Sequence, residues 1–202
     1  ETNVCPTGVT GIDAVAYDCG NGILYAANNG QIGSLNQATG AFTALASPAG
    51  SSANGALGTV NFNDINGLAY EPATSALYAS VNSVGTDVLI QINVATGTFV
   101  PNAFGVGIDY VAIGSIASIT DISVNHSDGL LYGIDGGADN LLTINKTTGA
   151  TSNVGALGIT NITGLGADGA GGFWGSTSNG AITENVYEVN SGTGVAANPR
   201  AI

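Results

Sequence analysis

One turn sequence occurs four times in this chain, and it constrains the fold more than any other feature. The pattern is Asn-x-x-Thr-Gly, in the stretches NQATGAFT (36–43), NVATGTFV (93–100), NKTTGATS (145–152) and NSGTGVAA (190–197). Asn side chains accept hydrogen bonds from backbone amides in turns, and Gly adopts positive φ without a Cβ clash. We therefore expect hairpin turns that run from Asn36 to Gly40, from Asn93 to Gly97, from Asn145 to Gly149 and from Asn190 to Gly194.

The residues before each turn repeat in the same order. An alternating apolar run begins at each of Ile12, Ile65, Ile119 and Ile162. A short turn, an apolar-aromatic pair and a third apolar run follow, and alternation of this kind predicts strands. The aromatic pairs are Leu24-Tyr25, Leu77-Tyr78, Leu131-Tyr132 and Phe173-Trp174. The polar residues of the first turn are typical turn formers rather than a catalytic set: Asp18, Glu71, Asn125 and Asp168.

Four strands in each of four repeats predict an all-β fold, a β-propeller with four blades of four antiparallel strands. We expect the propeller domain over residues 11–202, after an N-terminal extension of residues 1–10. A β-solenoid would have shorter repeats, and a sandwich would not explain four strand types in a constant order. The predicted blades span 11–46, 65–104, 119–155 and 162–202. Longer inserts separate the early blades, at 47–64 and 105–118, and the second insert contains the strand-like stretch IDYVAIG.

The combination I-x-G-L-A-Y-x-P…L-Y-A…I-N-x-x-T-G resembles the blades of secreted bacterial β-propeller proteins of the NHL and YncE-like kind. The resemblance covers residues 11 to about 200 and implies the propeller fold. It indicates function poorly, because such propellers serve as scaffolds, binders and enzymes. Some of them look like subunits of extracellular filaments. This chain differs in having four recognisable blades, so we expect either a small closed ring or a ring whose seam is completed by another chain.

The charge of the chain excludes several partners. Fourteen acidic residues stand against Lys146 and Arg200 alone, for a net charge of −12. A surface of this sign repels nucleic acids and anionic membranes. No apolar stretch approaches the roughly 20 residues of a membrane span, so we expect no membrane insertion.

The first residues suggest an oxidising compartment. The chain begins at Glu1 without a methionine, which fits either a removed leader or a sequence that was trimmed at this end. Cys5 and Cys19 are the two cysteines, and a Cys5–Cys19 disulfide would suit a secreted or cell-surface protein. Two buried free thiols are the alternative.

No catalytic constellation is evident, so we expect no enzyme and no cofactor. His126 is the single histidine and lies in a predicted turn beside Ser127 and Asp128. Multi-histidine metal sites are excluded by that count. A weak calcium candidate is the stretch DGGADN, with Asp135, Asp139 and Asn140, although a Gly-rich turn explains it better. Asp13 and Asp121, on first strands that line the channel, are a weaker candidate still.

Carbohydrate binding is the strongest alternative function for a small ligand. Seven tyrosines and Trp174 offer flat apolar faces, and the many Asn and Asp residues offer sugar partners. However, Tyr25, Tyr78, Tyr132 and Trp174 occupy equivalent repeat positions, where aromatic side chains are usually core packing. A lectin-like module that binds extracellular polysaccharide therefore stays the alternative.

The function that uses most of these features is structural. Few charges, tight hairpins and the absence of an assembled site suit an exposed extracellular protein that forms a homopolymer, as in a biofilm-matrix filament. The extension contains β-branched residues in alternation, Thr2, Val4, Thr7 and Val9. Such a segment can add as a strand to its own last blade or to a neighbouring subunit. We expect the neighbour, which would give head-to-tail assembly.

Overall fold

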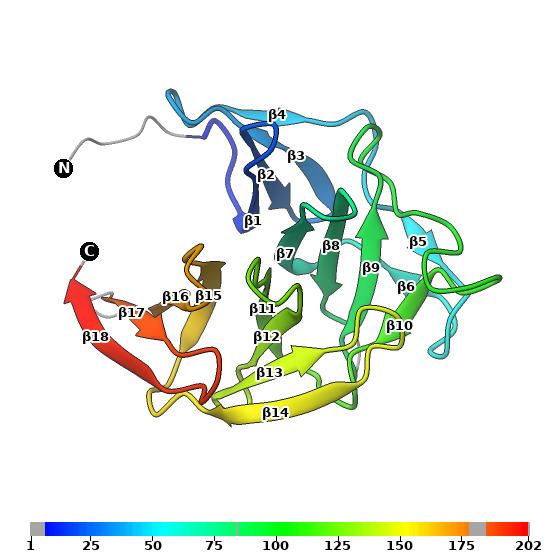
Figure 1. The fold of residues 1–202 in the computed structure, drawn as a ribbon. Coiled ribbons are helices and arrows are strands. Elements are labelled where there is room, and N and C mark those ends of the chain that lie inside the picture. Colours follow the sequence, from blue (N-terminus) through cyan, green and yellow to red (C-terminus); the bar gives the residue numbers. More distant parts are fainter. Residues whose placement is uncertain (1–6, 84, 178–184, 202) are drawn as a thin grey trace.

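The computed structural model describes residues 7–83, 85–177 and 185–201, which form a four-bladed β-propeller (Figure 1). Each blade is an antiparallel sheet of four strands, and the first strand of each blade lies nearest the centre. The predicted fold is therefore confirmed. None of the described residues forms a helix that could cross a membrane.

The strands follow one another in chain order. Blade one contains β1 (Ile12–Asp18), β2 (Ile23–Asn28), β3 (Gln31–Leu35) and β4 (Phe42–Ala44). Blade two contains β7 (Ile65–Glu71), β8 (Ala76–Val81), β9 (Val88–Ile92) and β10 (Tyr110–Ala112). Blade three contains β11 (Ile119–Val124), β12 (Leu131–Asp135), β13 (Asn140–Ile144) and β14 (Thr151–Ala156). Blade four contains β15 (Ile162–Ala167), β16 (Phe173–Thr177), β17 (Asn185–Val189) and β18 (Ala196–Ala201).

The four Asn-x-x-Thr-Gly turns form as the sequence predicts. In the first, Asn36 Oδ1 accepts hydrogen bonds from the amides of Ala38 and Thr39, each at 2.9 Å. The Gly40 amide donates to the Asn36 carbonyl oxygen at 2.7 Å, and Gly40 has φ +72°. The other three turns repeat the bond from the glycine amide to the Asn carbonyl, with glycine φ values between +71° and +89°.

A β-bulge also recurs near the start of every first strand. The register shifts after the opening isoleucine, between Ile12 and Ala14 in β1 and at the equivalent place in β7, β11 and β15. A bulge bends and twists its strand more strongly. The innermost strand of each blade is therefore bent at the same point, close to the axis.

Blade two departs from the predicted boundaries. Its fourth strand is β10, at residues 110–112, so the prediction that this blade ends at residue 104 is wrong. The residues after the turn make only an isolated bridge between Ile92 and Phe99, and the chain then loops out before it returns as β10. The other insert, 47–64, forms the hairpin of β5 (Ser51–Ser52) and β6 (Val60–Asn61).

The hydrophobic core lies in layers between adjacent blades. On β7, Leu68 and Tyr70 pack toward blade one, whereas Ala69 packs toward blade three. We call these two sides of a blade its upstream face and its downstream face. The aromatic residues of the second strands pack in the core where a following blade exists: Tyr25 and Tyr132 are buried on downstream faces, and Tyr78 is partly buried there.

Candidate functional site

The ring has one interface that differs from the other three. β1 packs against β7, β7 against β11, and β11 against β15, but β15 and β1 make no comparable contact within the described part of the chain. Figure 1 shows the two end blades facing one another across this opening. We call the downstream face of blade four and the upstream face of blade one the seam.

Exposure of repeat-equivalent residues identifies the seam quantitatively. Val15 of β1 is 47% exposed, whereas its equivalents Leu68, Ile122 and Leu165 are 2%, 0% and 6% exposed. Tyr17 is also 47% exposed, whereas its equivalent Tyr70 is 6% exposed. The same apolar position is therefore buried wherever a preceding blade covers it, and open where none does.

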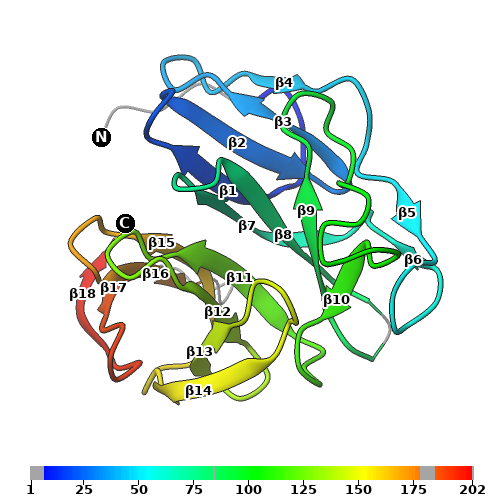
Figure 2. The ribbon, with the colours of Figure 1, turned by 45° about the vertical axis from the view of Figure 1, so that its right-hand side comes forward.

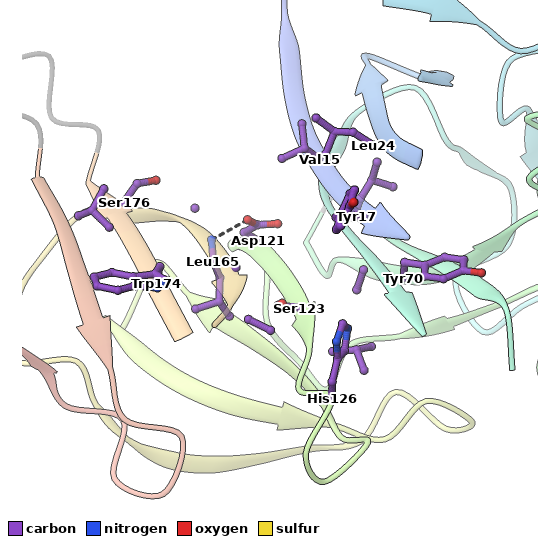
Figure 3. A pocket seen from close by; sticks show the side chains of 18 residues that line it. Val15, Tyr17, Leu24, Tyr70, Asp121, Ser123, His126, Leu165, Trp174 and Ser176 are labelled. Carbon is purple, nitrogen blue, oxygen red and sulfur yellow. Dashed lines mark hydrogen bonds between the residues drawn. The ribbon is translucent and has the colours of Figure 1, made fainter. Parts of the chain in front are cut away.

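A cavity of about 430 Å³ lies within the seam and reaches the centre of the ring. Figure 3 shows Val15, Tyr17 and Leu24 on one side of it and Leu165 and Trp174 on the other. His126 and Tyr70 lie at one end. The walls are mainly apolar, with few polar groups, which is the composition of a binding surface rather than of an acid-base centre.

Trp174 is the aromatic residue of blade four at the position of Tyr25 and Tyr132. Because no blade follows, its ring is only half-buried and lines the seam cavity. Arg200 lies over it, with Cζ 4.5 Å from the ring centroid, and also donates to Glu188 Oε1 at 2.9 Å. A cation over an indole face is favourable, so part of this surface is covered from within the chain.

Asp121 lies at the inner edge of the same cavity and joins blades three and four. Its Oδ2 accepts a hydrogen bond from the Leu165 amide at 2.7 Å, and its Oδ1 accepts one from the Ile122 amide at 2.8 Å. Burial raises the pKa of Asp121 well above its usual value, although the amides of Leu165, Ile122 and Leu68 oppose that shift. Its oxygens are occupied by backbone amides, so it serves as an inter-blade connection.

Glycine makes this connection sterically feasible. At the position of Asp121, the other blades have Ala14, Gly67 and Gly164. A Cβ on Gly67 would lie 2.8 Å from Asp121 Oδ1 and 2.6 Å from the Ile122 amide nitrogen. The carboxylate therefore needs glycine at this point of the preceding blade.

A second carboxylate ties blade two to blade three. Asp87 precedes β9, and its Oδ2 accepts a hydrogen bond from the Ile119 amide at 2.7 Å. Burial raises the pKa of Asp87, with the amides of Ile119 and Ser83 opposing. Sequence reasoning missed this residue, because a lone Asp in a hairpin gives no signal of a contact with the next repeat.

The calcium candidates do not converge. Asp135 Oδ1 accepts the amides of Gly137 and Ala138 within its own turn, and Asp139 Oδ1 accepts the Asn161 amide at 3.2 Å. Asn140 begins β13. Asp13 is exposed and accepts the Asn29 amide at 3.3 Å, whereas Asp121 is buried. Among the described residues, no group of three His, Cys, Asp or Glu side chains is placed to hold a metal ion.

His126 is exposed and has neither neighbour arranged for nucleophilic catalysis. The Ser127 hydroxyl donates to Asn125 Oδ1 at 2.9 Å. Asp128 accepts hydrogen bonds from the Leu130 amide and the Tyr132 hydroxyl. These contacts stabilise the first turn of blade three, as Asp18 and Asp168 do in theirs. That the protein is not an enzyme stays a prediction.

The predicted disulfide and the assembly segment are only partly visible. Cys19 is exposed, and it is not bridged to any other described residue. Cys5, Thr2 and Val4 lie outside the described residues, so the disulfide stays a prediction. The Thr7 carbonyl oxygen accepts a hydrogen bond from the Phe42 amide of β4 at 3.0 Å, and Val9 is exposed. The described end of the extension therefore contacts its own first blade.

Comparison with known proteins supplies a fold but no family. No protein-family model matches the chain, and no curated protein matches it. Solved structures do match over almost the whole chain.

Three similar structures illustrate the likeness. A PQQ-bound aldose sugar dehydrogenase from Streptomyces coelicolor is 14% identical with a TM-score of 0.53, over 99% of this chain and 83% of that one. An inactive virginiamycin B lyase from Staphylococcus aureus with quinupristin is 14% identical with a TM-score of 0.54, over 97% and 56%. Hydrazine synthase from Kuenenia stuttgartiensis is 13% identical with a TM-score of 0.56, over 100% and 51%.

The chain spans about half the length of the hydrazine synthase chain and of the lyase chain. At such low identity the likeness extends to the fold alone. The neighbours are propeller-type proteins, and this chain is a four-bladed β-propeller.

Proposed function

We propose that this protein is an extracellular structural subunit that assembles head to tail with further copies of itself at the seam. The observation that supports this most directly is the exposure of Val15 and Tyr17, whose equivalents are buried by a neighbouring blade elsewhere in the ring. Burial of apolar surface is the main favourable term in protein association. The seam therefore has the apolar surface of an interface between two blades, but within the described residues its two faces make no contact comparable to that between the other blades.

The charge distribution fits an assembly at this surface. The chain has a net charge of −12, so copies repel one another over most orientations. On the seam, Glu188 is paired with Arg200, and Val15, Tyr17, Leu24 and Trp174 are uncharged. An approach through the seam therefore brings few unpaired charges together.

The extension is the proposed donor of a strand to the neighbouring copy. Thr7 already contacts β4 of its own blade. We therefore propose that only the six residues before Thr7 form the donated strand. Those residues lie outside the described part of the chain. A strand donated to a sheet edge would supply main-chain hydrogen bonds and alternate side chains.

The test compares the full chain with a seam variant. Light scattering and electron microscopy should show polymers for the wild type, and Val15→Asp should abolish them while leaving the circular dichroism spectrum unchanged. Leu130→Asp is the matched control, because Leu130 is 46% exposed in the first turn of blade three, outside the seam. A wild type that stays monomeric at high concentration, or a Val15→Asp variant with unchanged polymers, would refute the proposal. Deletion of residues 1–4 tests the donated strand separately and should leave a folded monomer.

Binding of a polysaccharide is the second candidate, favoured by the seam cavity with Tyr17, Tyr70 and Trp174 on its walls. Aromatic faces of this kind suit the apolar faces of sugar rings. A glycan array would distinguish the two functions. Binding that is lost in Trp174→Ala, with the fold retained and no polymers in the wild type, would favour this candidate.

A further inference from the structure

The two inserts form a single substructure on the outer side of blade two. Residues 47–64 contain the β5–β6 hairpin, and residues 102–109 form the loop before β10. Figures 1 and 2 show these segments side by side, away from the seam. We call residues 47–64 together with 102–109 the insert platform. No blade repeat requires it, because the other blades close their third and fourth strands with a short turn.

Two residues next to each other join the halves of the platform. Asp109 is buried, and its Oδ2 accepts hydrogen bonds from Ser52 Oγ at 2.6 Å and Asn54 Nδ2 at 3.0 Å. The Tyr110 hydroxyl donates to the Gly58 carbonyl oxygen at 2.7 Å and accepts the Leu57 amide at 2.9 Å. Burial alone would raise the pKa of Asp109. Hydrogen bonds from the Ser52 side chain, the Asn102 amide and the Asn54 side chain outweigh this effect and lower the pKa.

The tip of the platform is held in one conformation by its own backbone. The Phe104 amide donates to the Ile108 carbonyl oxygen at 3.1 Å, and the Ile108 amide donates to the Gly105 carbonyl oxygen at 2.9 Å. Phe104 is buried against the core between blades two and three, which anchors the base of the loop. A fixed tip loses little conformational entropy when it binds a partner.

This fixed tip presents an apolar knob next to an apolar groove. Val106 is 100% exposed and Ile108, two residues further along the same loop, is 39% exposed; Leu57, on the other insert, is 43% exposed. A groove of about 520 Å³ adjoins the knob, lined by residues that include Gly55, Ala56, Ile108, Tyr110 and Thr148. Single exposed apolar residues are ordinary, but a contiguous patch next to a groove marks an interaction site.

The charges select a second copy of this chain as the partner. The insert platform contains two charged residues, Asp64 at its end, which is exposed, and Asp109, which is buried; residues 47–63 and 102–108 contain none. In a chain with a net charge of −12, two copies approach with least repulsion through a surface of this kind. A knob and a groove on one face also satisfy the requirement of a two-fold contact, in which the same patch must complement itself.

We propose that the insert platform is an isologous contact, in which Val106 of each copy enters the groove beside Ile108 of the other copy. This contact is independent of the seam and goes beyond the proposed function. Where both surfaces operate, the two-fold contact joins neighbouring polymers side by side.

The first experiment measures dimerisation in the full chain with Tyr17→Asp, which disables the seam. Sedimentation analysis should show a monomer–dimer equilibrium. Val106→Asp should raise its dissociation constant by roughly tenfold or more, because a charge would be buried without a partner. Val195→Asp, next to β18 of blade four and not among the residues that line the groove, is the control and should leave the equilibrium unchanged. A Tyr17→Asp protein without dimers, or dimers that Val106→Asp does not weaken, would overturn the proposal.

The second experiment tests the geometry of the contact. In a background of Cys5→Ser and Cys19→Ser, Val106→Cys and Ala56→Cys variants are mixed and treated with a short thiol cross-linker, since Ala56 lines the groove and is exposed. We expect covalent dimers from this mixture and none when Val195→Cys replaces Val106→Cys. Polymers without such dimers would refute the platform contact but not the proposed assembly at the seam. Dimers without polymers would refute the assembly at the seam but not the platform contact.

Discussion

Asp121 Oδ2 accepts the backbone amide of Leu165 at 2.7 Å, and this hydrogen bond joins the first strands of blades three and four. The same carboxylate accepts the Ile122 amide, so one buried acidic group organises two strands near the axis. Figure 3 shows the bond at the inner end of the seam cavity. A charged group in such a place makes folding stability sensitive to pH.

We predict that the stabilising contribution of Asp121 falls as pH rises. Burial raises its folded-state pKa well above the unfolded value of about 3.9. A carboxyl group with a raised pKa binds its proton more tightly in the folded state, so its contribution is complete below the unfolded pKa and is lost as pH rises through the folded pKa. The difference in unfolding free energy between wild type and Asp121→Asn should therefore shrink from pH 4 toward pH 8. Urea denaturation measures it, and a pH-independent difference would contradict the prediction.

Gly67→Ala should destabilise the protein by about 1–3 kcal/mol through overpacking. The added Cβ would lie 2.6 Å from the Ile122 amide nitrogen and 2.8 Å from Asp121 Oδ1. Gly166→Ala is the matched control, because no heavy atom lies within 4 Å of the corresponding Cβ. Thermal or urea denaturation measures the stability of both variants. If Gly67→Ala and Gly166→Ala are equally stable, the close contact between Gly67 and blade three does not require glycine.

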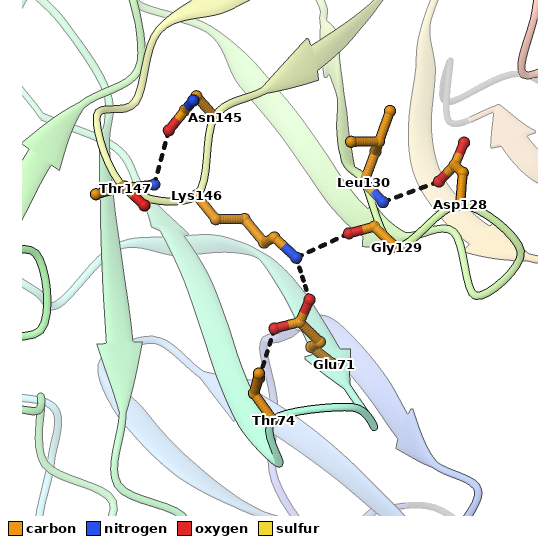
Figure 4. Close-up of polar contacts among 8 residues, drawn as sticks. All are labelled: Glu71, Thr74, Asp128, Gly129, Leu130, Asn145, Lys146 and Thr147. Carbon is orange, nitrogen blue, oxygen red and sulfur yellow. Dashed lines mark hydrogen bonds and ion pairs between the residues drawn. The ribbon is translucent and has the colours of Figure 1, made fainter.

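Lys146→Ala should cost about 1–3 kcal/mol, because it leaves the buried Glu71 carboxylate without its cationic partner. Lys146 Nζ donates to Glu71 Oε1 and to the Gly129 carbonyl oxygen, which links blades two and three (Figure 4). Burial would raise the pKa of Glu71, but hydrogen bonds from Lys146 and Thr74 outweigh it and lower that pKa. This contribution is therefore present above the unfolded pKa and is lost as pH falls through the folded pKa.

The other ion pair supplies the control for Lys146. Arg200 and Glu188 are both substantially exposed, so Arg200→Ala should change the unfolding free energy by less than about 1 kcal/mol. Denaturation at pH 7 and pH 4 should show a large effect of Lys146→Ala that decreases in acid. If Arg200→Ala proves as costly as Lys146→Ala, burial is not what distinguishes the two pairs.

The Cys5–Cys19 bridge is testable by mass alone. Cys19 is exposed, so a free thiol there would react readily with iodoacetamide. We expect the unreduced protein to resist alkylation and to gain two adducts only after reduction. Two adducts without reductant would rule the bridge out.

Sequence periodicity predicted the blades well because the residues that determine each turn lie within the turn itself. Asn36 and Gly40 act locally, through a side-chain oxygen and a positive φ, so the pattern alone places the hairpin. The fourth strand of blade two was misplaced because the insert separates β10 from its turn. Only the partner β9 and the anchors at Asp109 and Tyr110 determine where the chain returns.

The seam could not be predicted in the same way. Val15 and Leu68 are the same kind of residue at the same repeat position, yet one is exposed and the other buried. The difference depends on whether the ring closes, which is a property of the whole arrangement. Asp121 had a readable signal, an acid where Ala14, Gly67 and Gly164 stand, although its amide partners required the structure.

The seam also gives the ring the thermodynamics of a linear array. Blades two and three are each covered on both faces, whereas blades one and four are each covered on one. In such an array each unit depends on its nearest neighbours, so opening begins at the ends and moves inward. Amide hydrogens of β2 and β16 should therefore exchange with solvent before those of β8 and β12, because the free energy of local opening is lower in the end blades. Any partner that fills the seam would remove both ends at once and convert a chain that frays into a closed ring.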